Sequence, residues 1–376
     1  MCWNRRCAMR IRELYDLIDI VAPFRLQEEY DNAGLIVGSM DDEVRGVLLC
    51  LDVTHETVEE ADRVGANLIL SHHPPIFRAI KKLDPIQHSA LLAAIRMDMA
   101  LVAAHTNFDA AQDGLNAFVA RQMGLTDLRI LELHESERLY KVVTFVPPEF
   151  REQVLEAMFA AGAGHTGSYS RTSFRAAGAG GFVPDPGAHP FVGEENAMTS
   201  VAEDRVETIV SGRDLTSVLK ALRRAHPYEE PAVDVFEEHL PGSPLAGFGH
   251  IGRLPHVMDA EEFVTFIKSF FALSVLPVVG TLPEAIECVA FCSGSGSSLL
   301  PVASRAGAQV LITGDVTYHG ALDVSQRGGC VVIVDHYSSE RFFAAAMEEA
   351  LRSAAGDREL PPLHQSTADY QPVRFW

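Results

Sequence analysis

The stretch Leu68-Ile69-Leu70-Ser71-His72-His73-Pro74-Pro75 decides the fold of this chain. A short aliphatic run that ends abruptly in polar residues and prolines is typical of a buried parallel strand. Residues 101–109 and 331–340 have the same form, an apolar run followed by histidine and a carboxylate. Because ligands bind beyond the carboxyl ends of parallel strands, we expect the polar residues of the three blocks to converge.

The polar residues of the three blocks are histidines and carboxylates, the side chains that bind divalent transition metals. His336 and Glu340 are four residues apart, as are His105 and Asp109. Each pair shares one face if a helix begins directly after the strand. The spacing therefore predicts that both pairs point into one site.

His72 and His73 are adjacent, so they cannot share one face of a regular strand. The turn at Pro74 can direct the two rings to different points. Two such points, with a carboxylate able to bridge them, predict two metal ions rather than one. A single strand-end histidine is more often a hydrogen-bonded loop residue, and the chain has 15 histidines, but three blocks together favour a metal site.

The blocks Ser-His-His-Pro, His-Thr-x-x-Asp and His-x-x-x-Glu, in this order, resemble the Nif-three-like family, also called the GTP cyclohydrolase I type 2 family. The resemblance includes residues 31–35 and 313–319 and covers nearly the whole chain. It implies a two-metal site formed by His72, His73, Asp109, His336 and Glu340. The family usually has glycine before the third-block histidine, where this chain has Asp335. We expect this carboxylate either to support a ligand or to alter the site.

The order of apolar runs predicts an α/β fold, with mixed, mostly parallel sheets and helices on their faces. Strands and helices alternate in residues 9–136 and again in 245–376, which we expect to form one discontinuous metal-binding domain. Residues 137–244 read as strand–helix–strand–strand–helix–strand, a ferredoxin-like α+β order. The resemblance implies that this insert is similar to the PII and CutA proteins, with residues 226–231 as its signature. Residues 1–8 are expected to be a disordered extension.

Gly294, Ser295 and Gly296 follow a predicted strand and precede an apolar helix. Backbone N–H groups at such a turn favour an anion, which predicts substrate binding. A tight turn that only lets strand and helix pack explains the glycines equally well.

Further candidates for proton transfer lie at strand ends. Asp315 and His319 are four residues apart, and His105 has Asp109 at the same spacing. The predicted catalytic residues are His105, Asp315 and His319. A loop histidine with no catalytic role, or a partner that orients a ligand, is the alternative for each histidine.

Composition limits the function classes. The net charge of −20 argues against a general nucleic-acid binder, which normally has a basic surface. No apolar stretch reaches the length of a membrane span, and the six cysteines have no secretory context. We therefore expect a cytoplasmic protein that acts on a small molecule.

These features predict a dinuclear metal-dependent hydrolase that uses zinc, manganese, iron or cobalt. The resemblance implies a GTP cyclohydrolase-like reaction on a nucleotide or phosphorylated heterocycle, in a homohexamer. The alternative is a non-enzymatic metal-binding oligomeric scaffold or a metal-handling or regulatory protein. The insert is expected to regulate, to build the oligomer or to gate access to the site.

Overall fold

The computed structural model describes residues 9–239 and 244–374, so the predicted extension at residues 1–8 lies outside the described residues. The chain divides into two compact units. The larger comprises Met1–His134 and Ala246–Trp376, and the smaller is Glu135–Leu245. The larger unit has a mixed α/β architecture, as predicted, and contains two sheets. Among helices of the described ranges, none has the length and apolar character needed to cross a bilayer.

The first sheet has the strand order β1-β4-β3-β2-β15. Its strands are β1 (Gly34–Val37), β2 (Val47–Cys50), β3 (Leu68–Ser71), β4 (Ala100–Ala103) and β15 (Leu363–Gln365). Strands β15, β2, β3 and β4 are parallel, and β1 is antiparallel to β4. Because parallel strands end at the same edge of a sheet, the residues that follow β2, β3 and β4 lie close together.

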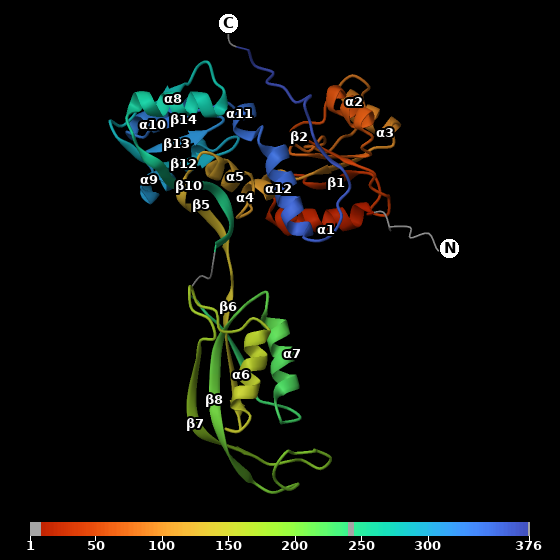
Figure 1. Cartoon of the computed structure of the whole chain (residues 1–376), viewed down its shortest axis with the longest axis vertical. Coiled ribbons are helices and arrows are strands. Elements are labelled where there is room, and N and C mark those ends of the chain that lie inside the picture. The colour runs from red at the N-terminus through yellow and green to blue at the C-terminus, as the bar shows by residue number, and fades with distance from the viewer. Residues whose placement is uncertain (1–8, 240–243, 375–376) are drawn as a thin grey trace. The chain divides into compact units, whose positions relative to one another are not determined.

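Helices cover both faces of this sheet. They are α1 (Ile11–Val21), α2 (His55–Val64), α3 (Ser89–Arg96) and α12 (Phe343–Ala355), with the 3-10 turn η1 (Phe24–Leu26) after α1. Val47 and Leu49 of β2 join the core formed with α1 and α12, whereas Leu48 and Cys50 join the core formed with α2 and α3. This double burial explains why the strand is a continuous apolar run. Figure 1 shows α1 and α12 packed side by side.

The second sheet has the order β11-β14-β13-β12-β10-β5. Its strands are β5 (Thr126–Ser136), β10 (Pro244–Met258), β11 (Val278–Val279), β12 (Ile286–Cys292), β13 (Val310–Thr313) and β14 (Val331–Ile333). Strands β12, β13 and β14 are parallel, so their carboxyl ends also meet at one edge. The remaining elements of the unit are α4 (Thr106–Ala110), α5 (Leu115–Gln122), α8 (Ala260–Phe271), η2 (Ser297–Leu299), α9 (Leu300–Ala306), α10 (Tyr318–Gln326) and α11 (His336–Glu340).

The smaller unit follows the order β6 (Leu139–Val146), α6 (Arg151–Ala160), β7 (Ser173–Phe182), β8 (Thr199–Ser211), α7 (Leu215–Ala225) and β9 (Val233–Glu237). Its strands form one antiparallel sheet in the order β7-β8-β6-β9. Helices α6 and α7 share a core with alternate residues of β6 and β8, such as Val142 and Val206. The other face of this sheet therefore carries no helix of the described part of the unit.

Candidate metal centre

Three strand ends bring six predicted side chains together. His72 and His73 directly follow β3, where Pro74 and Pro75 prevent the strand from continuing. After β4, His105 directly precedes the one-turn helix α4, and Asp109 lies within this helix. The third pair is formed by the first and last residues of α11, His336 and Glu340. Their ligand atoms form three groups of three, and the atoms of each group lie within 4.8 Å of one another. His72, His73 and Glu340 each belong to two of these groups.

Glu340 lies at the centre of the cluster. Its Oε2 atom is 3.0 Å from Nε2 of His73 and 3.0 Å from Nε2 of His336. Its Oε1 atom is 3.8 Å from Nε2 of His72, which is also 3.8 Å from Oδ2 of Asp109. One oxygen of the Glu340 carboxylate thus faces His73 and His336 and the other faces His72, an arrangement that suits a bridging ligand.

Two buried atoms in the cluster lack the regular hydrogen bonds that buried polar atoms normally have. Nε2 of His72 and Oε2 of Glu340 make no hydrogen bond of regular geometry to the described residues, although two imidazole nitrogens lie 3.0 Å from Oε2. A buried polar atom left unpaired costs free energy, so such atoms in a folded protein require an explanation. A divalent cation between these nitrogen and oxygen lone pairs supplies one, and the donor set fits zinc, manganese, iron or cobalt.

Each of the four histidines is anchored through its second ring nitrogen. The Nδ1 atoms of His72, His73, His105 and His336 lie 3.0, 2.9, 2.8 and 2.6 Å from oxygens of Ala104, Asp52, Asp31 and Asp315, respectively. When Nδ1–H donates to such an acceptor, Nε2 keeps its lone pair and the ring orientation is fixed. This arrangement is typical of histidines that bind metal.

The sequence pattern did not predict Asp52 as one of these acceptors, and Asp31 was included only within the motif at residues 31–35. Asp52 follows β2 as His73 follows β3, so the same strand-end rule could have found it. Asp31 comes from a loop before β1, and only the fold brings it to His105. Burial opposes its ionisation, but hydrogen bonds from His105 and Thr106 outweigh this and lower the pKa of Asp31 to about 2.

The charges in the cluster depend on one another. Burial works against ionised Glu340, but the facing imidazoles outweigh it and hold its pKa well below the usual range. Burial also opposes protonation of His73, yet Asp52 and Glu340 raise its pKa to about 10. Glu340 raises the pKa of His336 to about 9. Protons on these histidines therefore balance the buried carboxylate when no metal does so.

Gly294 allows the loop after β12 to approach Glu340 closely. Its φ angle is +57°, and a Cβ atom there would lie 2.5 Å from Oε1 of Glu340. The backbone N–H of Gly294 donates to Oγ of Ser339, and that of Gly296 donates to Oγ1 of Thr313. These two amides are thus used inside the protein, which favours the packing explanation for the glycines. Substrate binding by Gly294, Ser295 and Gly296 stays a prediction.

Asp335 occupies a backbone conformation that explains the glycine expected from the family. Its φ and ψ angles are +59° and +159°, a region that residues with a Cβ atom rarely adopt. Its carboxylate accepts hydrogen bonds from the backbone N–H and hydroxyl of Ser338 and from Nε2 of Gln371. It therefore caps α11, the helix that carries His336 and Glu340, and supports these ligands indirectly.

A cavity of about 370 Å³ opens beside the cluster. The predicted residues that line it are His105, Asp109, Gly294, Ser295, Gly296, His336 and Glu340. The cavity is also lined by Glu28, Glu132, His134 and Phe248, with the His134 ring 3.5 Å from the Glu132 carboxylate and edge-on to Phe248. No lysine or arginine of the described residues is among those lining it.

The other predicted catalytic residues lie differently. Asp315 is bound to Nδ1 of His336, so its position is that of a partner that orients a ligand. His319 lies exposed in the first turn of α10, where its ring contacts Tyr318 of the same helix. A catalytic role for either residue stays a prediction.

Similarity to known proteins identifies the family of this chain. The family model Duf34/NIF3 (NGG1p interacting factor 3) matches residues 9–367. The chain belongs to the Duf34/NIF3 family. As a NIF3-family chain, it is 38% identical to the GTP cyclohydrolase 1 type 2 homolog of Halalkalibacterium halodurans over 340 residues, which are 90% of this chain and 91% of that relative. The homolog of the same name in Bacillus subtilis is 33% identical, with 97% of this chain and 98% of that relative covered.

Two solved structures resemble nearly the whole chain. The Bacillus cereus protein related to NIF3 superposes with a TM-score of 0.85 at 34% identity, covering 98% of this chain and 99% of that one. The Staphylococcus aureus protein SA1388 gives 0.77 at 28% identity with the same coverage. This NIF3-family chain is therefore similar to its relatives over its full length, including the smaller unit.

Proposed function

We propose that this protein is a hydrolase that depends on two divalent metal ions. The observation that carries the proposal is the cluster of four anchored histidines around Asp109 and Glu340, with buried atoms left without regular hydrogen bonds. Bound divalent ions would supply an activated water and a Lewis acid at neutral pH. The names of its relatives, GTP cyclohydrolase 1 type 2 homolog, support a hydrolytic reaction of this class.

The protein's own residues divide into two ligand sets that share Glu340. His73 and His336 form one set with this carboxylate, and His72 and Asp109 form the other. Their outer partners, such as Asp52 and Asp315, hold the rings so that a metal ion meets a prepared site. His105 faces both the first pair of histidines and the cavity, so it can complete a metal site or give a proton to a leaving group.

The substrate would enter the cavity beside His336 and Glu340. A nucleotide or phosphorylated heterocycle is the class that the family name supports. The described cavity wall has carboxylates and no cationic side chain, so phosphate oxygens would have to rely on the metal ions for their counter-charge. This predicts weak nucleotide binding to the metal-free protein.

Elemental analysis of the untagged protein is the first test. We expect about two divalent ions per chain in the wild type, and loss of both in His72→Ala/His336→Ala. His256→Ala is the matched control, because His256 is exposed and paired with Glu262 outside the cluster. Metal content that the double substitution leaves unchanged would contradict the proposed site.

The second test separates an enzyme from a metal-binding scaffold. A screen of nucleotides and phosphorylated heterocycles with metal-loaded protein should give turnover that the double variant lacks. Metal binding at the cluster without turnover of any compound would contradict the hydrolase and favour a scaffold. Light scattering on the same samples tests the proposed homohexamer.

We also propose that the smaller unit is an inserted domain of the PII and CutA type with a regulatory or oligomer-building role. The antiparallel strand order β7-β8-β6-β9 supports this assignment. Deletion of residues 141–240 should change assembly, activity or both. If both stayed as in the wild type, this role would have to be abandoned.

A further inference from the structure

The helix-free face of the smaller unit contains a cavity of about 700 Å³. Successive side chains of β8 alternate between the two faces of the sheet. Asp204 and Val206 are buried on the side of α6 and α7, so Glu203 and Arg205 point to the opposite face, where they line this cavity. Its volume is that of a pocket for a small molecule.

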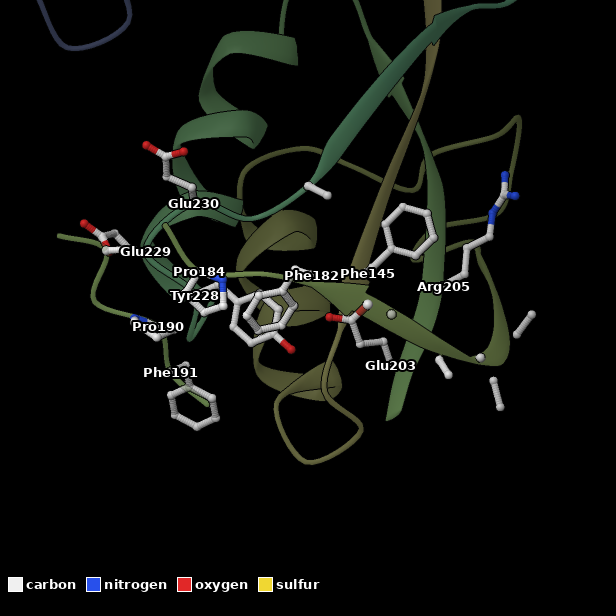
Figure 2. Close-up of a pocket in the computed structure, with 18 residues that line it drawn as sticks. Phe145, Phe182, Pro184, Pro190, Phe191, Glu203, Arg205, Tyr228, Glu229 and Glu230 are labelled. Atoms are coloured by element: carbon white, nitrogen blue, oxygen red, sulfur yellow. The ribbon is translucent and has the colours of Figure 1, made fainter. Parts of the chain in front are cut away.

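Aromatic rings make up much of the cavity wall. The four rings belong to Phe145, Phe182, Phe191 and Tyr228. The Tyr228 ring centroid is 6.4 Å from that of Phe182 and 6.1 Å from that of Phe191 (Figure 2). The loop that carries Phe191 is attached to this wall, because the backbone N–H of His189 donates to Glu229 at 3.1 Å. The rings thus come from four separate segments that meet around one space.

A carboxylate lies among these rings. Figure 2 shows the carboxylate of Glu203 directed toward Phe182 and Tyr228. Glycine at position 180 of the neighbouring strand makes room for it, since a Cβ atom there would overlap the carboxylate of Glu203. The position of this negative charge is therefore built into the sheet.

Arg205, the nearest cationic residue on the same strand, does not neutralise Glu203. Nη2 of Arg205 donates to Oε2 of Glu207 at 3.0 Å, and Figure 2 shows its guanidinium pointing away from Glu203. Glu229 and Glu230 add further negative charge to the wall. The field inside the cavity therefore favours a positively charged ligand.

The hydroxyl of Tyr228 offers a second contact in the same place. It is buried and makes no hydrogen bond of regular geometry to the described residues, although the Glu203 carboxylate lies close enough to interact with it. Burial and the nearby Glu203 carboxylate raise the pKa of Tyr228, so the phenol stays neutral. Its oxygen can accept a hydrogen bond from an ammonium group, and its ring face attracts a cation.

We propose that this cavity binds a small organic ammonium ion with an apolar body, its charge against Glu203 and Tyr228 and its body against Phe182 and Phe191. Aromatic faces combined with a carboxylate recognise such ions through cation–π attraction and a charge-assisted hydrogen bond. The site is separate from the metal centre and does not depend on its chemistry.

Calorimetric titration of the full-length protein tests this assignment with 2-phenylethylammonium as the probe. The neutral analogue 2-phenylethanol has almost the same shape, so the ratio of the two affinities isolates the charge. We expect the ammonium ion to bind at least about tenfold more tightly, since a desolvated cation–π contact and a charged hydrogen bond both contribute. Equal affinities, or no binding of the ammonium ion, would overturn the proposal.

Three variants locate the site. Glu203→Gln should remove most of the preference for the ammonium ion, and Gly180→Ala should do the same by displacing Glu203. Gly178→Ala is the control within the same cavity wall: it also adds a methyl group, but its Cβ would lie 3.6 Å from the backbone oxygen of Glu203, an ordinary contact, so the preference for the ammonium ion should remain. A preference that survives Glu203→Gln would place the binding elsewhere and contradict the assignment. Light scattering gives a further test. If the molar mass were lower for Gly180→Ala than for Gly178→Ala, this face would be a contact between two copies of the chain, and that result would also contradict the assignment.

Discussion

The metal cluster and the cavity of the smaller unit are built on opposite principles. In the cluster, each histidine is held from behind by an acceptor for its Nδ1 atom, at 2.6 to 3.0 Å. In the cavity, Phe182, Phe191 and Tyr228 are positioned by ring packing and by a loop. Hydrogen bonds to the second ring nitrogen fix the direction of each metal-facing lone pair, whereas ring packing alone mainly determines the shape of the cavity.

Glu340→Gln gives the sharpest separation of the two sites. The amide keeps the size of the side chain but removes the shared negative charge, so metal affinity should fall by at least about 1,000-fold, more than for loss of an outer partner. Binding of 2-phenylethylammonium should not change. Metal affinity is measured by competition with a chelator, with the exposed Glu349→Gln as control. Wild-type affinity in Glu340→Gln would show that this carboxylate is no ligand.

Gly294→Ala tests whether the metal cluster tolerates a small displacement of Glu340. The added Cβ atom would push on Oε1 of Glu340, and metal affinity should fall about 100-fold if a shift below 1 Å matters this much. Gly307→Ala is the matched control, with φ of +91° and no heavy atom of the described chain within 4 Å of the new Cβ. Both variants should lose about 1–2 kcal/mol of unfolding free energy from backbone strain. Equal metal affinities in the two variants would refute the close approach.

Asp52→Asn and Asp31→Asn remove outer partners and should weaken metal binding by about 10–100-fold each. The affected rings are those of His73 and His105. Asp127→Asn, an exposed carboxylate on β5, serves as control. If both substitutions left metal affinity within twofold of the control, packing alone would orient these histidines, and the contrast between the two sites would disappear.

The same contrast explains how much the sequence revealed. The five predicted metal ligands converge because each follows an apolar run whose length and ending identify a parallel strand. The anchoring of His105 by Asp31 depends on two loops 74 residues apart, which no local pattern relates. Strand β7 has a glycine-rich composition that disfavours a strand, yet it pairs with β8 along its length. The cavity beside it arises from such tertiary pairing, so the sequence did not predict it.

The pKa values of the cluster histidines predict how metal binding depends on pH. His73 and His336 have pKa values of about 10 and about 9, above the ordinary 6.5, so both are protonated in the metal-free protein at neutral pH. A metal must displace these protons, and its affinity should rise up to about 100-fold per pH unit between pH 7 and 9. Calorimetry in two buffers of different ionisation enthalpy should detect about two protons released at pH 7.5. Release of none would contradict the protonated state.

The metal-free protein should also lose stability at both pH extremes. Raised histidine pKa values stabilise the fold fully below pH 6.5, and this contribution is lost as the pH rises through 9 to 10. The lowered pKa of Glu340 stabilises the fold above pH 4.5, and that contribution is lost as the pH falls. Urea unfolding of chelator-treated protein should therefore give its highest unfolding free energy between about pH 4.5 and 6.5, where both contributions are present. A flat profile would mean that the cluster charges are not coupled to folding.

Asp335 should give the smallest effect. Asp335→Ala keeps the strained backbone and loses the cap, so unfolding free energy should fall by about 1–2 kcal/mol. Asp335→Gly loses the same cap but relieves the strain, and should stay within about 1 kcal/mol of the wild type. Denaturant unfolding of both variants measures the difference. If Asp335→Gly were the less stable of the two, backbone strain at this position would not be significant.

The last strand of the chain has a consequence for protein synthesis. Strand β15 pairs with β2, and the Asp369 carboxylate accepts the backbone N–H of Leu51 across 318 residues of sequence. The sheet that carries His72, His73 and His105 is therefore completed only after β15 has been synthesised. At translation rates of about 5–20 residues per second, β2 waits roughly 15–60 s for this partner. A nascent chain would expose the β2 edge of this sheet throughout that interval, and the metal cluster could not form before His336 and Glu340 had been synthesised.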